Sequence, residues 1–128
     1  MLASSNPQAD KKGSLYVTGD LEVRGQLSNG AVVALTPAAA VVVDASLGNV
    51  FSLAPGEDES ITAINQVAGQ RIVIIIATSA SSRTLTFSTG FKAQGTLATG
   101  TVTAKTFTIS FVSDGTNFHE NGRSTVLG

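Results

Sequence analysis

Alternating apolar and polar residues mark several short stretches of the chain as β-strands. In TFTISFV, residues 106–112, Phe107, Ile109 and Phe111 alternate with threonine and serine, and residues 84–87 show the same pattern. A period of two residues is typical of a strand with one buried face and one wet face. We therefore predict strands in both stretches, with the apolar side chains facing a core.

Continuous aliphatic runs predict further strands. Ile72–Ile76 is unbroken and entirely β-branched, so we expect a central strand that is covered on both faces. Shorter candidates are Val41–Val43, Val50–Leu53 and Ile61–Asn65. An alanine-rich helix over Pro37–Val43 is the alternative for the first of these, but the valine run disfavours it because β-branched side chains lose rotamer freedom in helices.

Turn residues separate these strands at short intervals. Asn29-Gly30 and Asp114-Gly115 are dipeptides that favour tight hairpin turns, since both residues of each pair tolerate positive φ. No stretch has a convincing amphipathic-helix pattern. Many short strands with regular turn signals predict an all-β fold, and we expect an antiparallel β-sandwich or a jelly-roll-like barrel.

The chain divides into three parts. Residues 1–13 are small and polar and are expected to form a flexible, extended N-terminal arm, with an ordinary frayed terminus as the alternative. Residues 14–36 hold short strand candidates punctuated by glycine, and we expect β-hairpins that pack between subunits because such strands bury little surface alone. Residues 37–128 are expected to form the antiparallel β-sandwich.

Composition narrows the classes of partner. The chain has 128 residues, which suits a single domain, and only 13% of them are charged, with a formal net charge of −1. Such a chain lacks the basic field that nucleic acid or an anionic membrane requires, so we expect neither partner. It has no cysteine, which excludes disulfides and thiolate metal sites, and its polar N-terminus lacks the apolar core of a secretory signal. A weakly charged surface suits a permanent contact.

The one histidine lies in the segment FVSDGTNFHENGR, beside several charged residues. His119 follows Asp114 and is followed by Glu120 and Arg123. If Asp114-Gly115 turns a hairpin, strand alternation places Phe118 in the core beside Phe111, leaves His119 on the opposite face, and returns Glu120 to the Phe118 side at a strand end where it reaches water. A catalytic histidine needs a partner nucleophile or base, so we interpret this one as a surface or interface residue.

The carboxylates offer no better case for catalysis or metal binding. The run Glu57, Asp58 and Glu59 lacks the spacing of a calcium loop, and is expected to be a solvated acidic turn. Glycoside hydrolysis requires a pair drawn from Asp44, Asp58, Glu59 and Glu120, and nothing in the sequence pairs them. We therefore predict no catalytic, cofactor-binding or metal-binding residue, no cofactor, and no enzymatic activity.

The stretch from Asn65 to Arg123 resembles a β-domain of tailed-bacteriophage virion proteins, found in capsid decoration (cement) proteins and in tail or head-fibre modules. The resemblance rests on a G-Q-R turn with an aliphatic strand (Gly69–Ile76), on S-S-R-T-L-T-F and G-F-K-x-x-G-T, and most specifically on F-V-S-D-G-x-x-F-H-E (Phe111–Glu120). The family often has tryptophan or tyrosine where this chain has phenylalanine after the last turn. Separately, Val17–Leu27 is similar to the glycine-punctuated repeats of trimeric viral fibres.

The resemblance implies a structural virion protein, commonly a homotrimer, that is made in the host cytoplasm and resides on the capsid surface, bound to the major capsid protein. The expected partner-binding residues lie in the arm and in the segment that follows it: Pro7, Lys11, Lys12, Leu15, Tyr16, Leu21, Val23 and Leu27. A tail-fibre or head-fibre tip that binds a host surface ligand is the alternative, although no tryptophan and one tyrosine offer little for stacking on sugars. A small depolymerase is a third, weaker one.

Overall fold

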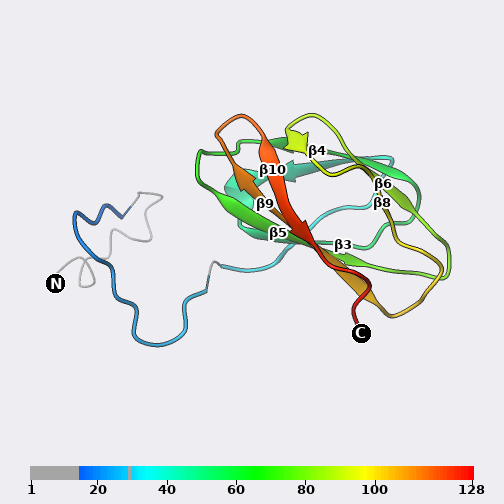
Figure 1. Cartoon of the computed structure of the whole chain (residues 1–128), viewed down its shortest axis with the longest axis horizontal. Helices are drawn as coiled ribbons and strands as arrows, with labels where there is room; N and C mark the ends of the chain where they lie inside the picture. Colours follow the sequence, from blue (N-terminus) through cyan, green and yellow to red (C-terminus); the bar gives the residue numbers. More distant parts are fainter. Residues whose placement is uncertain (1–14, 29) are drawn as a thin grey trace.

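The computed structural model describes residues 15–28 and 30–128, and these fold into an all-β body preceded by an extended segment (Figure 1). The described residues form ten strands and one short 3₁₀ helix, η3 (Ala45–Leu47). The strands are β1 (Val33–Ala34), β2 (Ala40–Asp44), β3 (Val50–Leu53), β4 (Glu59–Ile64), β5 (Arg71–Ala77), β6 (Thr84–Phe87), β7 (Phe91–Lys92), β8 (Leu97–Ala98), β9 (Thr106–Ser113) and β10 (Phe118–Arg123).

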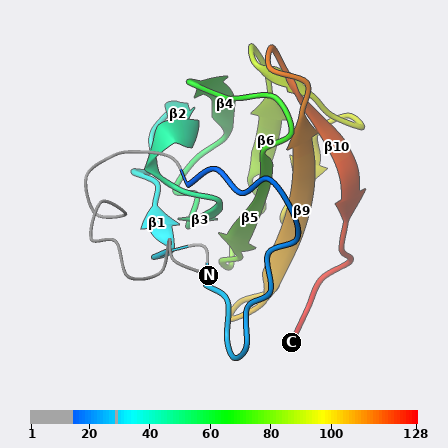
Figure 2. The same ribbon diagram turned by 90° about the vertical axis from the view of Figure 1, so that its left-hand side faces the viewer.

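The strands form two sheets that face each other (Figure 2). One sheet has the order β1-β3-β5-β9-β10-β7 and the other β2-β4-β6-β8. The all-β prediction is confirmed, but the expectation of purely antiparallel pairing is wrong. β1, β3 and β5 run parallel, as do β2, β4 and β6, and β7 is parallel to β10. Among the strands, the antiparallel pairs are β5–β9, β9–β10 and β6–β8, and an isolated antiparallel bridge joins Thr106 to Leu127.

The parallel pairing follows from the path of the chain, which is solenoid-like in its first half. Successive strands from β1 to β6 alternate between the two sheets, so strands that are adjacent within a sheet are separated in sequence by a strand of the other sheet. Val33 thus pairs with Phe51 and Phe51 with Ile74. Parallel strands need a crossover connection, which is usually a helix. Here a strand of the facing sheet supplies the crossover, so no helix is needed. This agrees with the absence of an amphipathic-helix pattern in the sequence.

The core lies between the sheets and is built from the inward residues of each strand. In β2, Val41 and Val43 are buried, and in β4 Ile61 and Ala63 are buried. The alternation predicted for residues 84–87 and 106–112 is confirmed, since Leu85, Ile109 and Phe111 are buried. Four phenylalanines cluster at one end of the core, with ring centroids 4.8 to 6.4 Å apart between the contacting pairs: Phe87, Phe91, Phe111 and Phe118.

β5 has the central position expected, but only one of its faces is covered. It lies between β3 and β9, and Ile72, Ile74 and Ile76 are fully buried. Val73 and Ile75 point to the other face and remain partly exposed. A continuous aliphatic run does not reveal whether a second layer covers the outer face, because that depends on the rest of the chain or on a partner.

Residues 14–36 differ from the expected hairpins. No strand is formed within residues 15–28, and Asn29 of the expected Asn29-Gly30 turn lies outside the described residues. Val33–Ala34 is the one strand in the described part of this region, and it pairs with β3 of the body. Without a neighbouring strand, the backbone of residues 15–28 has no ladder to join.

Candidate partner-binding surface

His119 lies at a solvent-exposed hairpin, as its sequence context predicted. Asp114 accepts hydrogen bonds from the backbone N–H groups of Thr116 and Asn117, each at 2.8 Å, and so closes the turn between β9 and β10. His119 Nε2 lies 2.8 Å from the other carboxylate oxygen of Asp114. These contacts, above all the Asn117 N–H bond, lower the pKa of Asp114 well below its usual range. Both polar side chains are thereby committed to the hairpin.

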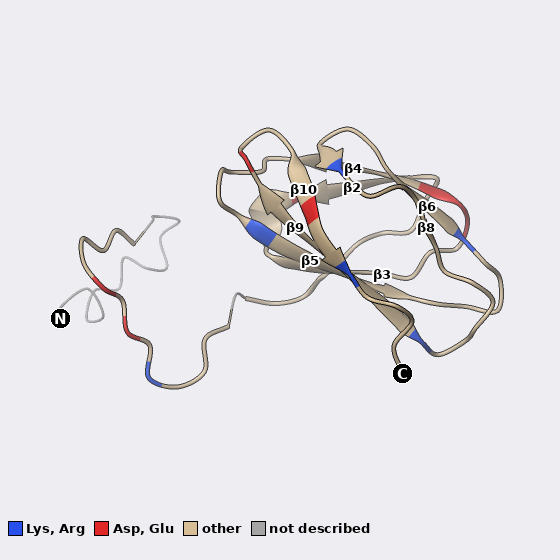
Figure 3. Cartoon of the chain, viewed as in Figure 1, with Lys and Arg blue, Asp and Glu red and all other residues tan. Residues whose placement is uncertain are grey.

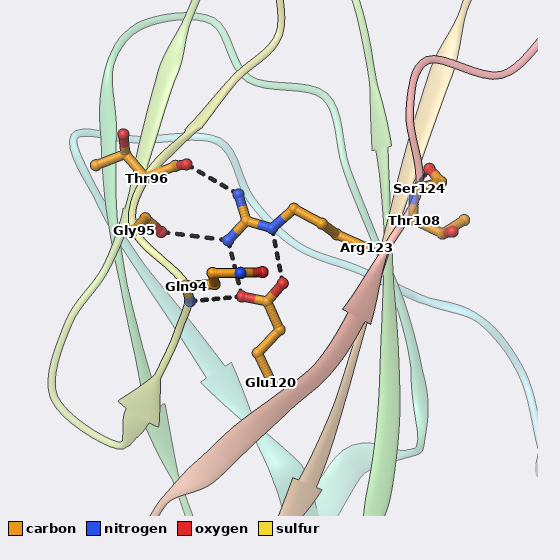
Figure 4. A network of polar contacts seen from close by, with 7 residues as sticks. All are labelled: Gln94, Gly95, Thr96, Thr108, Glu120, Arg123 and Ser124. Carbon is orange, nitrogen blue, oxygen red and sulfur yellow. Dashed lines mark hydrogen bonds and ion pairs between the residues drawn. The ribbon is translucent and has the colours of Figure 1, made fainter.

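Glu120 does not reach water as expected but forms a nearly buried ion pair. Arg123 Nε and Nη2 donate to the two carboxylate oxygens of Glu120 at 2.7 and 2.8 Å (Figure 4). The same guanidinium donates to the carbonyl oxygens of Gly95 and Thr96, and Gln94 N–H donates to Glu120. The pair therefore fastens the loop after β7 onto β10, which is a structural role.

The ion pair shifts the pKa of both partners in the stabilising direction. Hydrogen bonding to Arg123 lowers the pKa of Glu120, and the carboxylate in turn raises the pKa of Arg123. The lowered pKa of Glu120 and the raised pKa of Arg123 keep both groups charged at neutral pH, and both are hydrogen-bonded to protein partners, which favours a structural role for the pair over acid–base chemistry.

The remaining carboxylates are used locally and are not brought together. Asp44 caps η3 by accepting from Ser46 N–H, and Asp58 accepts from Thr84 N–H at 2.8 Å. Glu59 is buried where β4 begins, although the acidic turn was expected to be solvated throughout. Within residues 15–28 and 30–128, no three His, Asp or Glu side chains converge in a way that could hold a metal ion.

Glu59 gives the fold a specific pH dependence. Burial raises its pKa, with a smaller opposing contribution from the Gly56 N–H bond. A raised folded-state pKa means that its favourable contribution is complete below the usual glutamate pKa and is lost as pH rises through the raised value. We expect Glu59→Gln to be as stable as the parent chain in acid and more stable at neutral pH.

Urea unfolding of the parent and Glu59→Gln chains at several pH values measures this difference directly. Glu57→Gln is the matched control, because it makes the same change at an exposed glutamate of the same turn. A Glu59→Gln advantage that shrinks as pH rises would contradict the burial of this carboxylate.

The predicted partner-binding residues of residues 15–27 are exposed along one extended segment. Leu15, Tyr16, Leu21, Val23 and Leu27 all project into solvent, with Tyr16 85% and Leu27 71% exposed. Pro7, Lys11 and Lys12 lie outside the described residues. In Figure 1 the segment runs away from the body, and the described chain has no hydrogen bond between residues 15–28 and the strands. Its apolar side chains thus have no cover from the residues that the structure describes.

The body offers apolar and sparsely charged surface at the edge from which this segment departs. Figure 3 marks few charged residues along the strands. A groove of about 340 Å³ is lined by Ala34, Pro37, Ile75 and Ala77, among others. A second groove, of about 380 Å³, lies between the two first strands. It is lined mainly by apolar residues, with Asp44 among them: Val33, Leu35, Val42, Leu47 and Phe51, together with smaller residues.

Sequence reasoning missed Val42 and Leu47, which are 52% and 64% exposed. The valine run at 41–43 indicated a strand but carried no signal that the strand would lie at a sheet edge. Edge position depends on the spatial order of strands, which is not encoded within a short stretch of sequence.

Comparison with protein-family models, with curated proteins and with solved structures returned no match. None of the helical segments in the described ranges has the length and apolar character needed to cross a bilayer.

Proposed function

We propose that this chain is a structural virion protein, a capsid decoration or cement protein that binds the outside of a phage head and stabilises contacts between capsid subunits. The observation that carries the proposal is the exposed apolar segment at residues 15–27, which is joined to a sparsely charged β body. Apolar side chains displayed in a row are expected to be covered in the working assembly.

The resemblance of residues 65–123 to phage virion β-domains supports the same proposal. Its most specific part, Phe111–Glu120, is the β9–β10 hairpin, whose phenylalanines are core residues and whose polar residues close the turn. Side chains of that motif pack in the core, close the turn or form the ion pair that holds the loop after β7. This is the pattern expected of a module that is kept for its shape and not for chemistry.

The mechanism in this proposal is additive burial of surface. A standard protein interface removes roughly 1,600 Å² from water, and a homotrimer repeats its contacts around the axis. The two facing sheets serve as a β-sandwich-like body, and the N-terminal arm extends over the major capsid protein. The chain acts on the capsid surface without cofactor or catalysis, and it needs neither nucleic acid nor a membrane.

Deleting residues 1–12 tests the contribution of the arm. We expect binding of the truncated chain to undecorated heads to weaken at least about tenfold, which corresponds to about 1.4 kcal/mol. Occupancy is measured by quantitative gel analysis of sedimented heads across a range of protein concentrations. A chain with residues 1–12 replaced by a Gly/Ser segment of equal length is the control for length alone, and it should bind as weakly as the deletion. Unchanged occupancy of the deletion variant would refute a role for the arm.

A further inference from the structure

The two sheets both end in an open edge on the side where the chain enters the body. β1 is the last strand of one sheet and β2 the last strand of the other. In a parallel pair of strands, every second residue of one strand directs its N–H and C=O groups to the other strand. The N–H group of Ser60 in β4 donates to the carbonyl oxygen of Ala39, the residue before β2. The N–H and C=O groups of Ala40 and Val42 therefore point toward the open edge, where the described chain supplies no strand to receive them.

The groove between these two edges is the space that a further turn of the solenoid would fill. Its lining includes Val33 and Leu35 on one side and Val42 and Leu47 on the other. Open parallel edges flanking an apolar groove form a template for an added strand.

Residues 15–23 repeat the apolar pattern of the turns that follow them. In β4, Ile61 and Ala63 are the register partners of Val41 and Val43. Leu21 and Val23 lie as many residues before this valine pair as Ile61 and Ala63 lie after it. The match places the segment's side chains at the inward positions of a strand beside β2.

A second series shows the same regularity in the other sheet. Val33 lies opposite Phe51 of β3, and Leu35 and Leu53 follow them at the same spacing. Leu15 and Val17 lie as many residues before Val33 and Leu35 as Phe51 and Leu53 lie after them. The segment thus carries both halves of one solenoid turn, an inward pair for the β1 edge and an inward pair for the β2 edge.

We propose that residues 15–27 of one copy of this chain dock on the open β1 and β2 edges of a second copy, as one additional turn of its solenoid. A second copy is the occupant because, among residues 15–28 and 30–128, every chain carries both a segment without cover and an edge without a partner. The segment also extends away from its own body (Figure 1). The contact joins two different surfaces, so it closes into a ring when the rotation between copies permits. This docking involves only copies of the chain, so it does not depend on the proposal that the chain binds a capsid.

Cysteine crosslinking tests the proposal in a chain that has no native cysteine. In the docked register Glu22 of the segment lies beside Val42 of β2, and both are exposed in the single chain. Two chains, one carrying Glu22→Cys and the other Val42→Cys, are co-expressed with tags of different mass and treated with a short bismaleimide. The expected product is a heterodimer that contains one chain of each kind.

The control replaces Val42→Cys by Lys92→Cys, because Lys92 lies on β7 at the far edge of the larger sheet. That pair should give no heterodimer. A chain carrying both Glu22→Cys and Val42→Cys distinguishes docking on a second copy from docking of the segment on its own body. A crosslink within one chain, with no product that joins two chains, would overturn the proposal. Absence of the heterodimer in the first experiment would overturn it as well.

Native mass spectrometry supplies a second measurement that does not depend on crosslinking. The double variant Leu21→Asp/Val23→Asp is expected to lose the oligomer while its circular dichroism spectrum stays that of the folded chain, because both side chains are exposed in the single chain. An oligomer of unchanged mass would contradict the docking. Since capsid binding is read out in neither experiment, failure of the capsid proposal and failure of this one are distinguishable.

Discussion

Replacing Phe111 by alanine is expected to lower the free energy of unfolding by about 4 kcal/mol. Phe111 is 1% exposed, and its ring centroid lies 4.8 Å from that of Phe91 and 5.4 Å from that of Phe87. The substitution removes buried apolar surface and leaves a cavity between two sheets that cannot close over it. Aromatic pairing adds to the loss, at about 0.5–1.5 kcal/mol for each pair.

Chemical denaturation followed by circular dichroism measures this loss. Domains are commonly stable by about 5–15 kcal/mol, so the variant is expected to be folded at best marginally. Phe111→Leu keeps an apolar side chain and should lose less. Tyr16→Ala is the matched aromatic control, because Tyr16 is exposed, and it should change stability by less than about 0.5 kcal/mol. A loss below about 1 kcal/mol for Phe111→Ala would be inconsistent with the packing of the two sheets.

Replacing Arg123 by alanine is expected to cost about 3 kcal/mol. The Glu120 side chain is only 4% exposed, so removal of Arg123 leaves a carboxylate with little access to water and no ionic partner. It also frees the carbonyl groups of Gly95 and Thr96 and so releases the loop after β7. Because the pKa of Glu120 is lowered in the folded chain, the contribution of the pair is present above the usual glutamate pKa and is lost as pH falls.

The chain contains a matched control for this ion pair. Arg24 and Glu22 also form a contact, at 3.2 Å, but their side chains are 85% and 71% exposed. Arg24→Ala is expected to change stability by no more than about 0.5 kcal/mol, because exposed pairs contribute little. The double variant Glu120→Ala/Arg123→Ala should recover part of the loss, since it removes the unpaired charge. Equal effects of Arg123→Ala and Arg24→Ala would mean that the Glu120 site is solvated.

Local signals predicted the elements that depend on local chemistry. The Asp114-Gly115 turn forms because the aspartate side chain binds the N–H groups two and three residues later, and both residues of the turn lie within one short stretch. The alternation in residues 106–112 likewise identified the buried face of β9. These features need no knowledge of the rest of the fold.

Features that depend on the spatial order of strands were not accessible in the same way. Parallel pairing of β2 with β4 arises because the chain passes through the opposite sheet between them, and no local pattern records that path. Burial of Glu59 is a second example, since the acidic run around it is typical of solvated turns, and the strands β2 and β6 on either side of β4 are distant in sequence. The exposed position of Val42 has the same origin.

The apolar residues of the candidate surface were identified from the sequence, but their role in binding a partner stays a prediction. The apolar residues of the segment, Leu21 and Val23 among them, were identified because short strands with alternating apolar residues need a neighbour, and in the structure these side chains are exposed. The edges of β1 and β2 that offer such a neighbour became visible only with the sheet order. What covers the segment in the working assembly stays a prediction.

The number of copies of the chain in purified virions tests the central proposal most directly. Quantitative mass spectrometry against isotope-labelled peptides gives this number relative to the major capsid protein. A decoration protein occupies the many equivalent positions of a head, so the expected result is a fixed ratio to the capsid protein and hundreds of copies per particle. A dozen copies or fewer, or absence from the particle, would contradict the proposal that this chain decorates a capsid.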